Sequence, residues 1–266
     1  MRVRRLGWAG VEIESGDRRL VIDYVQDLSP MFTGWTAGTG LTRPDGEVDA
    51  ALVTHLHRDH TDAAAIADVL APGAPVLRPP PDRGDEDDTA LTQVAERELA
   101  VHRPATELLD VWDTRTVGPF RATAVPAVDG FGDPQVSWVV EADGRRVFHG
   151  GDTLFHGYWW HVTRRFDPLD AAFLPVNGVV VDAPLRQPPS RLPAAMDPRQ
   201  AAEAARILGA RHPVPMHYEP EQPDTLPDYT EVDDPAGEFL RHTGGRARVL
   251  PVGEWLELAP GTGEVS

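Results

Sequence analysis

A cluster of metal-binding residue types directly follows an apolar segment near the start of the chain. Residues 48–54 (VDAALVT) form the continuous apolar run typical of a strand buried on both faces. His55, His57, Asp59 and His60 follow it as H-x-H-x-D-H. Side chains two residues apart in an extended segment point the same way, so the two leading histidines are expected to share one ion. The later aspartate and histidine come after the turn and are expected to face a second ion. The pattern therefore predicts a metal site at the end of a buried strand.

The rest of the pattern predicts a mixed α/β (α+β) chain. Residues 3–24 predict a β-hairpin that turns at Gly16 and Asp17. Helices are expected over 62–70, 198–208 and 235–242, the last two with Asp197 and Asp234 as N-caps followed by proline. Further strands are expected at 120–127, 136–142, 145–152, 170–178, 213–217, 247–251 and 254–258. This order predicts one domain over 1–266, with two mixed sheets and helices outside them.

Several segments carry no clear element. Residues 26–47 are long and lack periodicity, which indicates a functional loop or lid. Residues 78–89 are rich in proline and acidic residues and predict a solvated surface loop. The glutamate-bearing segments 10–15 and 95–99 are interpreted as solvated faces.

Composition narrows the chemistry. Cysteine is absent, so a disulfide framework, a thiolate nucleophile and a cysteine-held metal are excluded, and any metal is held by nitrogen and oxygen. All 25 basic residues are arginine, which excludes lysine Schiff-base and P-loop chemistry. The net charge of -17 argues against nucleic-acid and anionic-membrane partners. No signal-peptide or membrane-spanning segment is recognised, so the cytoplasm is the expected location.

Together with later motifs, the cluster resembles the metallo-β-lactamase superfamily, in particular its ascorbate-phosphate-lactonase-like and N-acyl-phosphatidylethanolamine-phospholipase-like branches. The resemblance spans nearly the whole chain and implies a four-layer αβ/βα sandwich. It implies that Asp23 supports the metal loop, that Asp152 in HGGDT bridges both ions, and that His217 in PMHY completes the second site. Without the other motifs of the family pattern, Asp152 would be interpreted as a turn residue and His217 as a structural histidine.

Two positions depart from the family pattern. Asp129 in AVPAVDG stands where relatives usually have a histidine, and Trp8 stands where relatives often have another. A carboxylate ligand makes the first site harder and shifts its preference toward Mn²⁺ or Fe²⁺ relative to Zn²⁺. Three alternatives stay open: Asp129 is a simple turn residue, the first site is weak, or His149 or His156 replaces it as a ligand.

The resemblance implies a metallo-hydrolase with two divalent ions, Zn or Mn/Fe. A metal-bridging hydroxide would attack an ester, lactone or amide of a small molecule, with Asp59 and Asp152 catalytic. A phosphodiesterase acting on a small phosphate ester, and a non-hydrolytic relative with an altered first site, are the alternatives. A homo-oligomer remains open. The predicted substrate-pocket residues are Trp35, His156, Trp159, Asn177 and Arg186.

Overall fold

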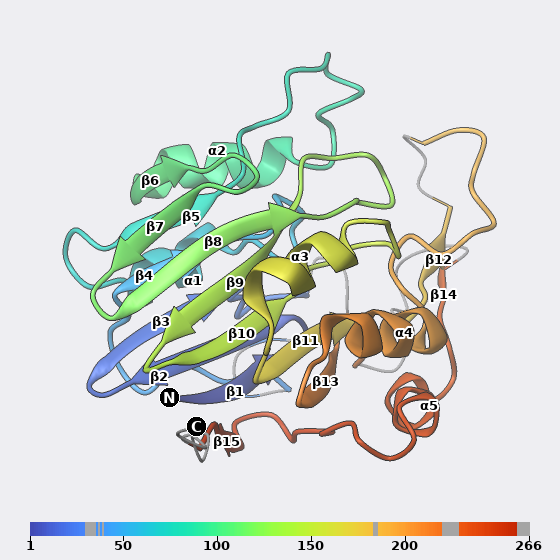
Figure 1. The fold of residues 1–266 in the computed structure, drawn as a ribbon. Coiled ribbons are helices and arrows are strands. Elements are labelled where there is room, and N and C mark those ends of the chain that lie inside the picture. Colours follow the sequence, from blue (N-terminus) through green and yellow to red (C-terminus); the bar gives the residue numbers. More distant parts are fainter. Residues whose placement is uncertain (30–35, 37, 39, 183–185, 220–228, 260–266) are drawn as a thin grey trace.

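Two β-sheets pack face to face and carry helices on their outer faces (Figure 1). The structure is a computed structural model, and it describes residues 1–29, 36, 38, 40–182, 186–219 and 229–259. The first sheet has the order β15-β1-β2-β3-β4-β5-β6. Its strands are β1 (Arg2–Gly7), β2 (Gly10–Ser15), β3 (Arg18–Ile22), β4 (Ala50–Leu52), β5 (Pro75–Arg78), β6 (Ala105–Leu108) and β15 (Trp255–Glu257).

The second sheet has the order β13-β11-β10-β9-β8-β7. Its strands are β7 (Thr114–Val117), β8 (Phe120–Pro126), β9 (Val136–Ala142), β10 (Arg145–His149), β11 (Ala171–Pro175) and β13 (His212–Met216). Strands β7 to β10 form an antiparallel meander, whereas β10, β11 and β13 are parallel. A small third sheet, absent from the sequence-based prediction, pairs β12 (Val180–Val181) with β14 (Tyr229–Thr230).

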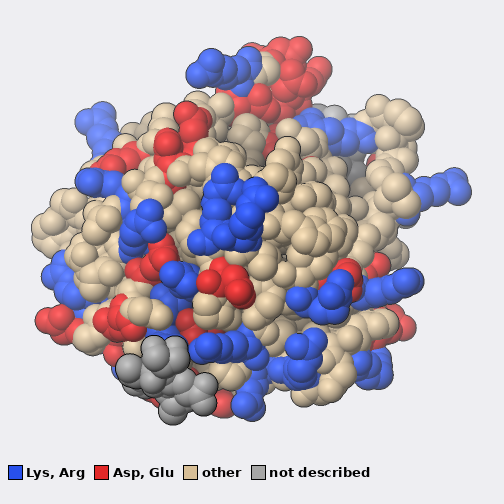
Figure 2. Space-filling view, viewed as in Figure 1, with Lys and Arg blue, Asp and Glu red and all other residues tan. Residues whose placement is uncertain are grey.

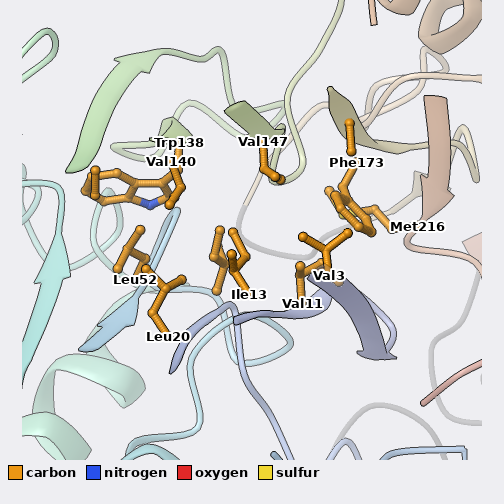
Figure 3. Packing of buried hydrophobic residues seen from close by; sticks show 14 of the residues in the cluster. Val3, Val11, Ile13, Leu20, Leu52, Trp138, Val140, Val147, Phe173 and Met216 are labelled. Carbon is orange, nitrogen blue, oxygen red and sulfur yellow. The ribbon is translucent and has the colours of Figure 1, made fainter. Parts of the chain in front are cut away.

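The main core fills the space between the two large sheets (Figure 3). Alternate residues of the first sheet point inward because successive side chains of a strand face opposite sides. They meet large side chains of the second sheet, and the residues labelled in the figure are Val3, Val11, Ile13, Leu20, Leu52, Trp138, Val140, Val147, Phe173 and Met216. Residues 10–15 are buried along their whole length, so their interpretation as a solvated face was wrong.

Helices cover the outer faces of both sheets, which gives the four layers expected. Helices α1 (Ala63–Val69) and α2 (Gln93–His102) pack on the first sheet. Helices α3 (Trp159–Phe166), α4 (Pro198–Leu208) and α5 (Pro235–His242) lie on the side of the second sheet. The two predicted caps are confirmed, because Asp197 and Asp234 each accept a hydrogen bond from a backbone N–H of the first turn. Asp62 caps α1 in the same way.

Three local predictions were wrong. Residues 95–99 belong to α2, with Ala95 and Leu99 buried; the N-cap Thr92 makes no side-chain capping bond, so the usual start signal is missing. Helix α3 was missed although Trp159, Val162 and Phe166 follow a helical spacing on its buried face. Residues 247–251 contain no strand. Among the helices in the described ranges, none is long and apolar enough to cross a membrane.

Candidate metal centre

His55, His57 and Asp129 form the first of two buried clusters of ligand-type atoms. One ligand atom from each of the three residues lies within 4.8 Å of the others. The Nε2 atom of His55 is 2.9 Å from Nδ1 of His57, so two ring nitrogens face each other. The two histidines follow β4, and Asp129 comes from the loop after β8 in the opposite sheet. The first cluster therefore forms where the two sheets meet at one end.

The loop that follows Asp129 holds its carboxylate in place. Oδ2 accepts the backbone N–H groups of Phe131, at 2.8 Å, and Asp133, at 3.1 Å. Gly130 allows the tight approach of this loop, because a Cβ there would lie 2.1 Å from the carbonyl oxygen of Ala194. Burial raises the pKa of Asp129, and the neighbouring His57 partly offsets the rise. Asp129 thus occupies the turn expected of it and also faces the two histidines.

Asp59, His60, Asp152 and His217 form the second cluster, again with ligand atoms within 4.8 Å of one another. Oδ1 of Asp152 lies 3.1 Å from His60 Nε2 and 2.8 Å from His217 Nε2. Oδ2 of Asp59 lies 3.3 Å from His217 Nε2 and 3.5 Å from His60 Nε2. The four residues come from three separate segments of the chain, so only the fold brings them together.

Electrostatics within the second cluster favour ionised carboxylates. Burial opposes charge on all four residues, but the attraction between opposite charges outweighs it. The pKa of His60 is raised well above its usual value by Asp152, Asp59 and Asp23, and that of His217 is raised to about 9, chiefly by Asp152. The same pairs hold the pKa of Asp59 and of Asp152 below the usual range. The cluster thus concentrates negative charge. Protons balance this charge, and a metal cation can balance it in their place.

Asp23, just after β3, holds the loop that carries His55, His57, Asp59 and His60. Its Oδ1 accepts the backbone N–H of Thr54 at 2.8 Å, and its Oδ2 accepts the Thr54 hydroxyl at 2.7 Å. Oδ2 also lies 2.7 Å from Nδ1 of His60. This contact fixes which ring nitrogen of His60 is left to face the second cluster.

Trp8 braces the second cluster from the turn between β1 and β2. Its Nε1–H donates to Oδ2 of Asp59 at 3.0 Å, and its ring packs on His217 with centroids 4.1 Å apart. Its backbone carbonyl accepts the N–H of His217 at 3.1 Å. Trp8 therefore contacts and orients two members of the cluster from the position at which the family resemblance implied that a histidine is often found.

The donor set fits divalent metal ions. His60 Nε2 and Asp152 Oδ1 are buried, lie 3.1 Å apart and make no hydrogen bond of acceptable geometry within the described chain. Such atoms are costly to bury without a partner, and an ion between them would satisfy both. Imidazole and carboxylate ligands suit Zn²⁺, Fe²⁺ and Mn²⁺. The residues present thus fit one ion at each cluster.

His149 and His156 do not join the first cluster. Nε2 of His149 lies 2.8 Å from the carbonyl oxygen of Ala9, and its Nδ1 accepts the N–H of Gly151. His156 stacks on Trp159, with ring centroids 4.1 Å apart, and burial lowers its pKa to about 4. Neither histidine belongs to a group of ligand atoms in the parts of the chain described, so the structure favours Asp129 over both.

The predicted pocket residues fall in different places. Trp35 lies outside the described residues. Trp159 is fully buried in the core beneath α3, away from solvent. Asn177 is buried in the loop after β11, close to His217, which directly follows the neighbouring strand β13. Arg186 donates to the carbonyl oxygens of Phe131, Asp87 and Asp88 and lies 3.4 Å from Asp133, so it ties three loops together.

Two features were missed in the sequence. Oδ2 of Asp133 lies 2.9 Å from Nε2 of His57, and Asp133 is buried. Its position four residues after Asp129 gave no periodic signal, although a carboxylate near a ligand histidine is a usual supporting partner. Tyr229 and Glu231, which contact Asn177, were also missed, because they follow a segment without recognisable motifs.

Comparison with known families and proteins agrees with the fold. The family model described as "Beta-lactamase superfamily domain" matches residues 18–218. A UPF0173 metal-dependent hydrolase of Thermococcus onnurineus is 30% identical over 269 residues, covering 97% of this chain and 100% of the relative. One of Pyrococcus abyssi is also 30% identical, with the same coverage of both chains.

Solved structures share the fold at low sequence identity. CmlA, a diiron β-hydroxylase from Streptomyces venezuelae, superimposes with a TM-score of 0.74 at 18% identity over 96% of this chain. This chain spans about half, 53%, of the hydroxylase. An isothiocyanate hydrolase from Delia radicum gut bacteria has a TM-score of 0.66 at 16% identity, covering 97% of this chain and 98% of that one. The family match over most of the chain, the full-length relatives and the shared fold place this chain in the metallo-β-lactamase-fold superfamily.

Proposed function

We propose that the chain is a metal-dependent hydrolase that uses two divalent ions to cleave an ester, lactone or amide of a small molecule. The observation that carries this proposal is the pair of buried clusters, His55, His57 and Asp129 beside Asp59, His60, Asp152 and His217. Two adjoining sets of imidazole and carboxylate ligands are the arrangement used by two-metal hydrolytic sites. The names of the full-length relatives, metal-dependent hydrolases, support the same class.

The chain's own residues prepare this chemistry. Divalent ions, when bound, supply Lewis acidity for the substrate oxygen and bring the pKa of water toward neutrality. Asp59 is kept ionised by His60 and His217, so its carboxylate is available to bind a cation and to accept a hydrogen bond from water. Trp8 and Asp23 hold the neighbouring ligands in fixed orientations, which reduces reorganisation during the reaction.

Size and charge favour a small molecule. A cavity of 440 Å³ is lined by Gly130, Phe131 and Gly132. The ring of Phe131 also packs edge-on against the ring of His57, so the cavity adjoins the first cluster. This volume is in the range of small-molecule sites. The exposed loop between β5 and α2 carries Asp82, Asp85, Glu86, Asp87 and Asp88, the red group at the top of Figure 2. Such a rim repels the phosphates of nucleic acids.

The carboxylate in the first cluster shifts its metal preference toward iron or manganese relative to zinc. It offers two histidines and one aspartate, and a carboxylate in place of an imidazole makes a site harder. We therefore infer Fe²⁺ or Mn²⁺ at this cluster.

A panel of lactones, carboxylic esters, amides and phosphodiesters tests the proposed reaction on protein loaded separately with Zn²⁺, Mn²⁺ and Fe²⁺. Hydrolysis of carbonyl substrates that is lost in Asp59→Asn supports the proposal. Hydrolysis confined to phosphodiesters would replace it with the phosphodiesterase alternative. Asp17→Asn, in the exposed turn after β2, is the matched control and should keep full activity.

A second candidate is oxidation rather than hydrolysis. Two histidines and one carboxylate, as in the first cluster, are also the ligand set of many non-haem Fe²⁺ oxygenases. The similarity to the diiron β-hydroxylase supports the same possibility. Consumption of O₂ by the iron-loaded protein with a reductant and a member of the same panel, without hydrolysis of any panel member, would favour this candidate.

A further inference from the structure

A group of polar side chains outside both clusters lies beside His217. Strands β11 and β13 run parallel, with Pro175 opposite Met216. The backbone N–H of Val176 donates to the carbonyl oxygen of Met216 at 3.2 Å, so Asn177 and His217 leave the sheet side by side. The backbone N–H of Val232 in turn donates to the carbonyl oxygen of Asn177 at 2.9 Å, which brings the segment after β14 to the same edge.

Three side chains meet at this place. The hydroxyl of Tyr229 donates to Oε2 of Glu231 at 3.1 Å. Nδ2 of Asn177 lies 3.4 Å from the Tyr229 hydroxyl and 3.5 Å from the same carboxylate oxygen. Burial is the main cause that raises the pKa of both Glu231 and Tyr229. The charges of the neighbouring centre also reach this group, because His217 partly offsets the pKa rise at Glu231 and Asp59 adds to the pKa rise at Tyr229. The group and the second cluster therefore lie within electrostatic reach of each other.

The group has unused hydrogen-bond acceptors. Oδ1 of Asn177 is fully buried and has no hydrogen-bond partner among the described residues. The hydrogen bonds from Tyr229 and Asn177 both use Oε2 of Glu231, which leaves Oε1 available. Within the described ranges no arginine forms an ion pair with this carboxylate. Burial raises the pKa of Glu231, as expected for a half-buried acid without a cationic partner. A buried acceptor without a donor is costly, so a donor supplied by a ligand would be stabilised here.

We propose that Asn177, Tyr229 and Glu231 form a subsite that binds a protonated amino group of the substrate beside the second cluster. An ammonium group has three donors and no acceptor, which matches an amide oxygen and a carboxylate oxygen without partners. The inference rests on the proposed function only in calling the ligand a substrate. It narrows the substrate class to small molecules that carry an amine close to the bond that is cleaved.

Equilibrium binding tests the subsite without any need for turnover. The metal-loaded full chain is titrated calorimetrically at neutral pH with phenethylamine and with 2-phenylethanol, which has a neutral hydroxyl in place of the ammonium. The wild type should bind the amine about tenfold more tightly, the effect of one charged hydrogen bond. Glu231→Gln, which keeps the shape but removes the charge, should bind the two probes equally.

Two further variants complete the test. Glu254→Gln removes an exposed carboxylate elsewhere and should keep the full preference for the amine. Glu231→Asp keeps the charge but shortens its reach and should give an intermediate preference, so the result does not depend on one variant folding. Equal affinities in the wild type, no measurable binding of the amine, or a preference that survives in Glu231→Gln would overturn the proposal. If the wild type hydrolyses no member of the substrate panel, these binding results still stand. That failure would count only against the proposed function.

Discussion

Asp133 fixes the orientation of His57: its Oδ2 lies 2.9 Å from Nε2 of the imidazole, while Nδ1 of the same ring lies 2.9 Å from His55. The aspartate itself is held by the N–H contact to Asp129 and by Arg186. A carboxylate behind a ligand histidine selects its tautomer and raises its basicity. Asp133 and Asp129 together raise the pKa of His57 despite its burial.

Asp133→Asn should weaken metal binding at the first cluster by about 10- to 100-fold, because the neutral amide no longer selects the productive tautomer. Competition with a chelator of known affinity measures the change. Asp17→Asn should bind metal as the wild type does. An unchanged affinity in Asp133→Asn would mean that His57 does not bind an ion through Nδ1.

Trp8→Phe should selectively weaken the second cluster. The substitution keeps a ring against His217 but removes the Nε1–H donor to Asp59. Losing a hydrogen bond to a charged group corresponds to about a tenfold loss of metal affinity. A metal titration that resolves two binding steps measures this loss. Only the affinity of the step assigned to the second cluster should change. Equal weakening of both steps would point to a general loss of structure instead.

Asp129→His should shift the first cluster toward zinc. The variant gives the cluster the three histidines that the family resemblance implied, and imidazole is a softer ligand than carboxylate. Protein expressed with equimolar Zn²⁺, Fe²⁺ and Mn²⁺ should carry a larger share of zinc in the variant than in the wild type. An unchanged metal ratio would show that Asp129 is only a turn residue, as its VDG sequence also allows.

His156 should contribute to acid sensitivity. Burial lowers its pKa from 6.5 to about 4, so the folded protein keeps this side chain neutral where the unfolded chain binds a proton. The stability that depends on the neutral form is thus fully present above pH 6.5 and is lost as the pH falls toward about 4. The Tm of His156→Gln should fall less than that of the wild type across this interval. Parallel curves for the two proteins would contradict the assignment.

The sequence predicted the parts of the site that follow strongly patterned strands. These residues all stand at the ends of apolar runs: the cluster follows β4, Asp152 follows β10 and His217 follows β13. The structure brings them together. Whether each of them binds an ion stays a prediction. The strands β8 to β10 and the caps of α4 and α5 were likewise readable, because strand periodicity and an aspartate–proline start are local signals.

What the sequence did not reveal depends on contacts between distant segments. Asp133 meets His57 across 76 positions, and Glu231 meets Asn177 across 54, without any periodic pattern linking them. Arg186 was predicted as a substrate-pocket residue and lines the cavity beside the first cluster, yet much of its hydrogen bonding goes to backbone carbonyls of two other loops. Such roles depend on how loops close over the site, and local propensity carries no information about that.

The metal content of the two clusters tests the central claim most directly. The chain is expressed in medium supplemented with iron, manganese and zinc, and its crystals are examined by anomalous diffraction at each absorption edge. We expect one peak among Asp59, His60, Asp152 and His217, and a second among His55, His57 and Asp129, with close to two metal ions per chain in solution. Less than about half an equivalent of metal per chain, without a peak at either cluster, would contradict the account.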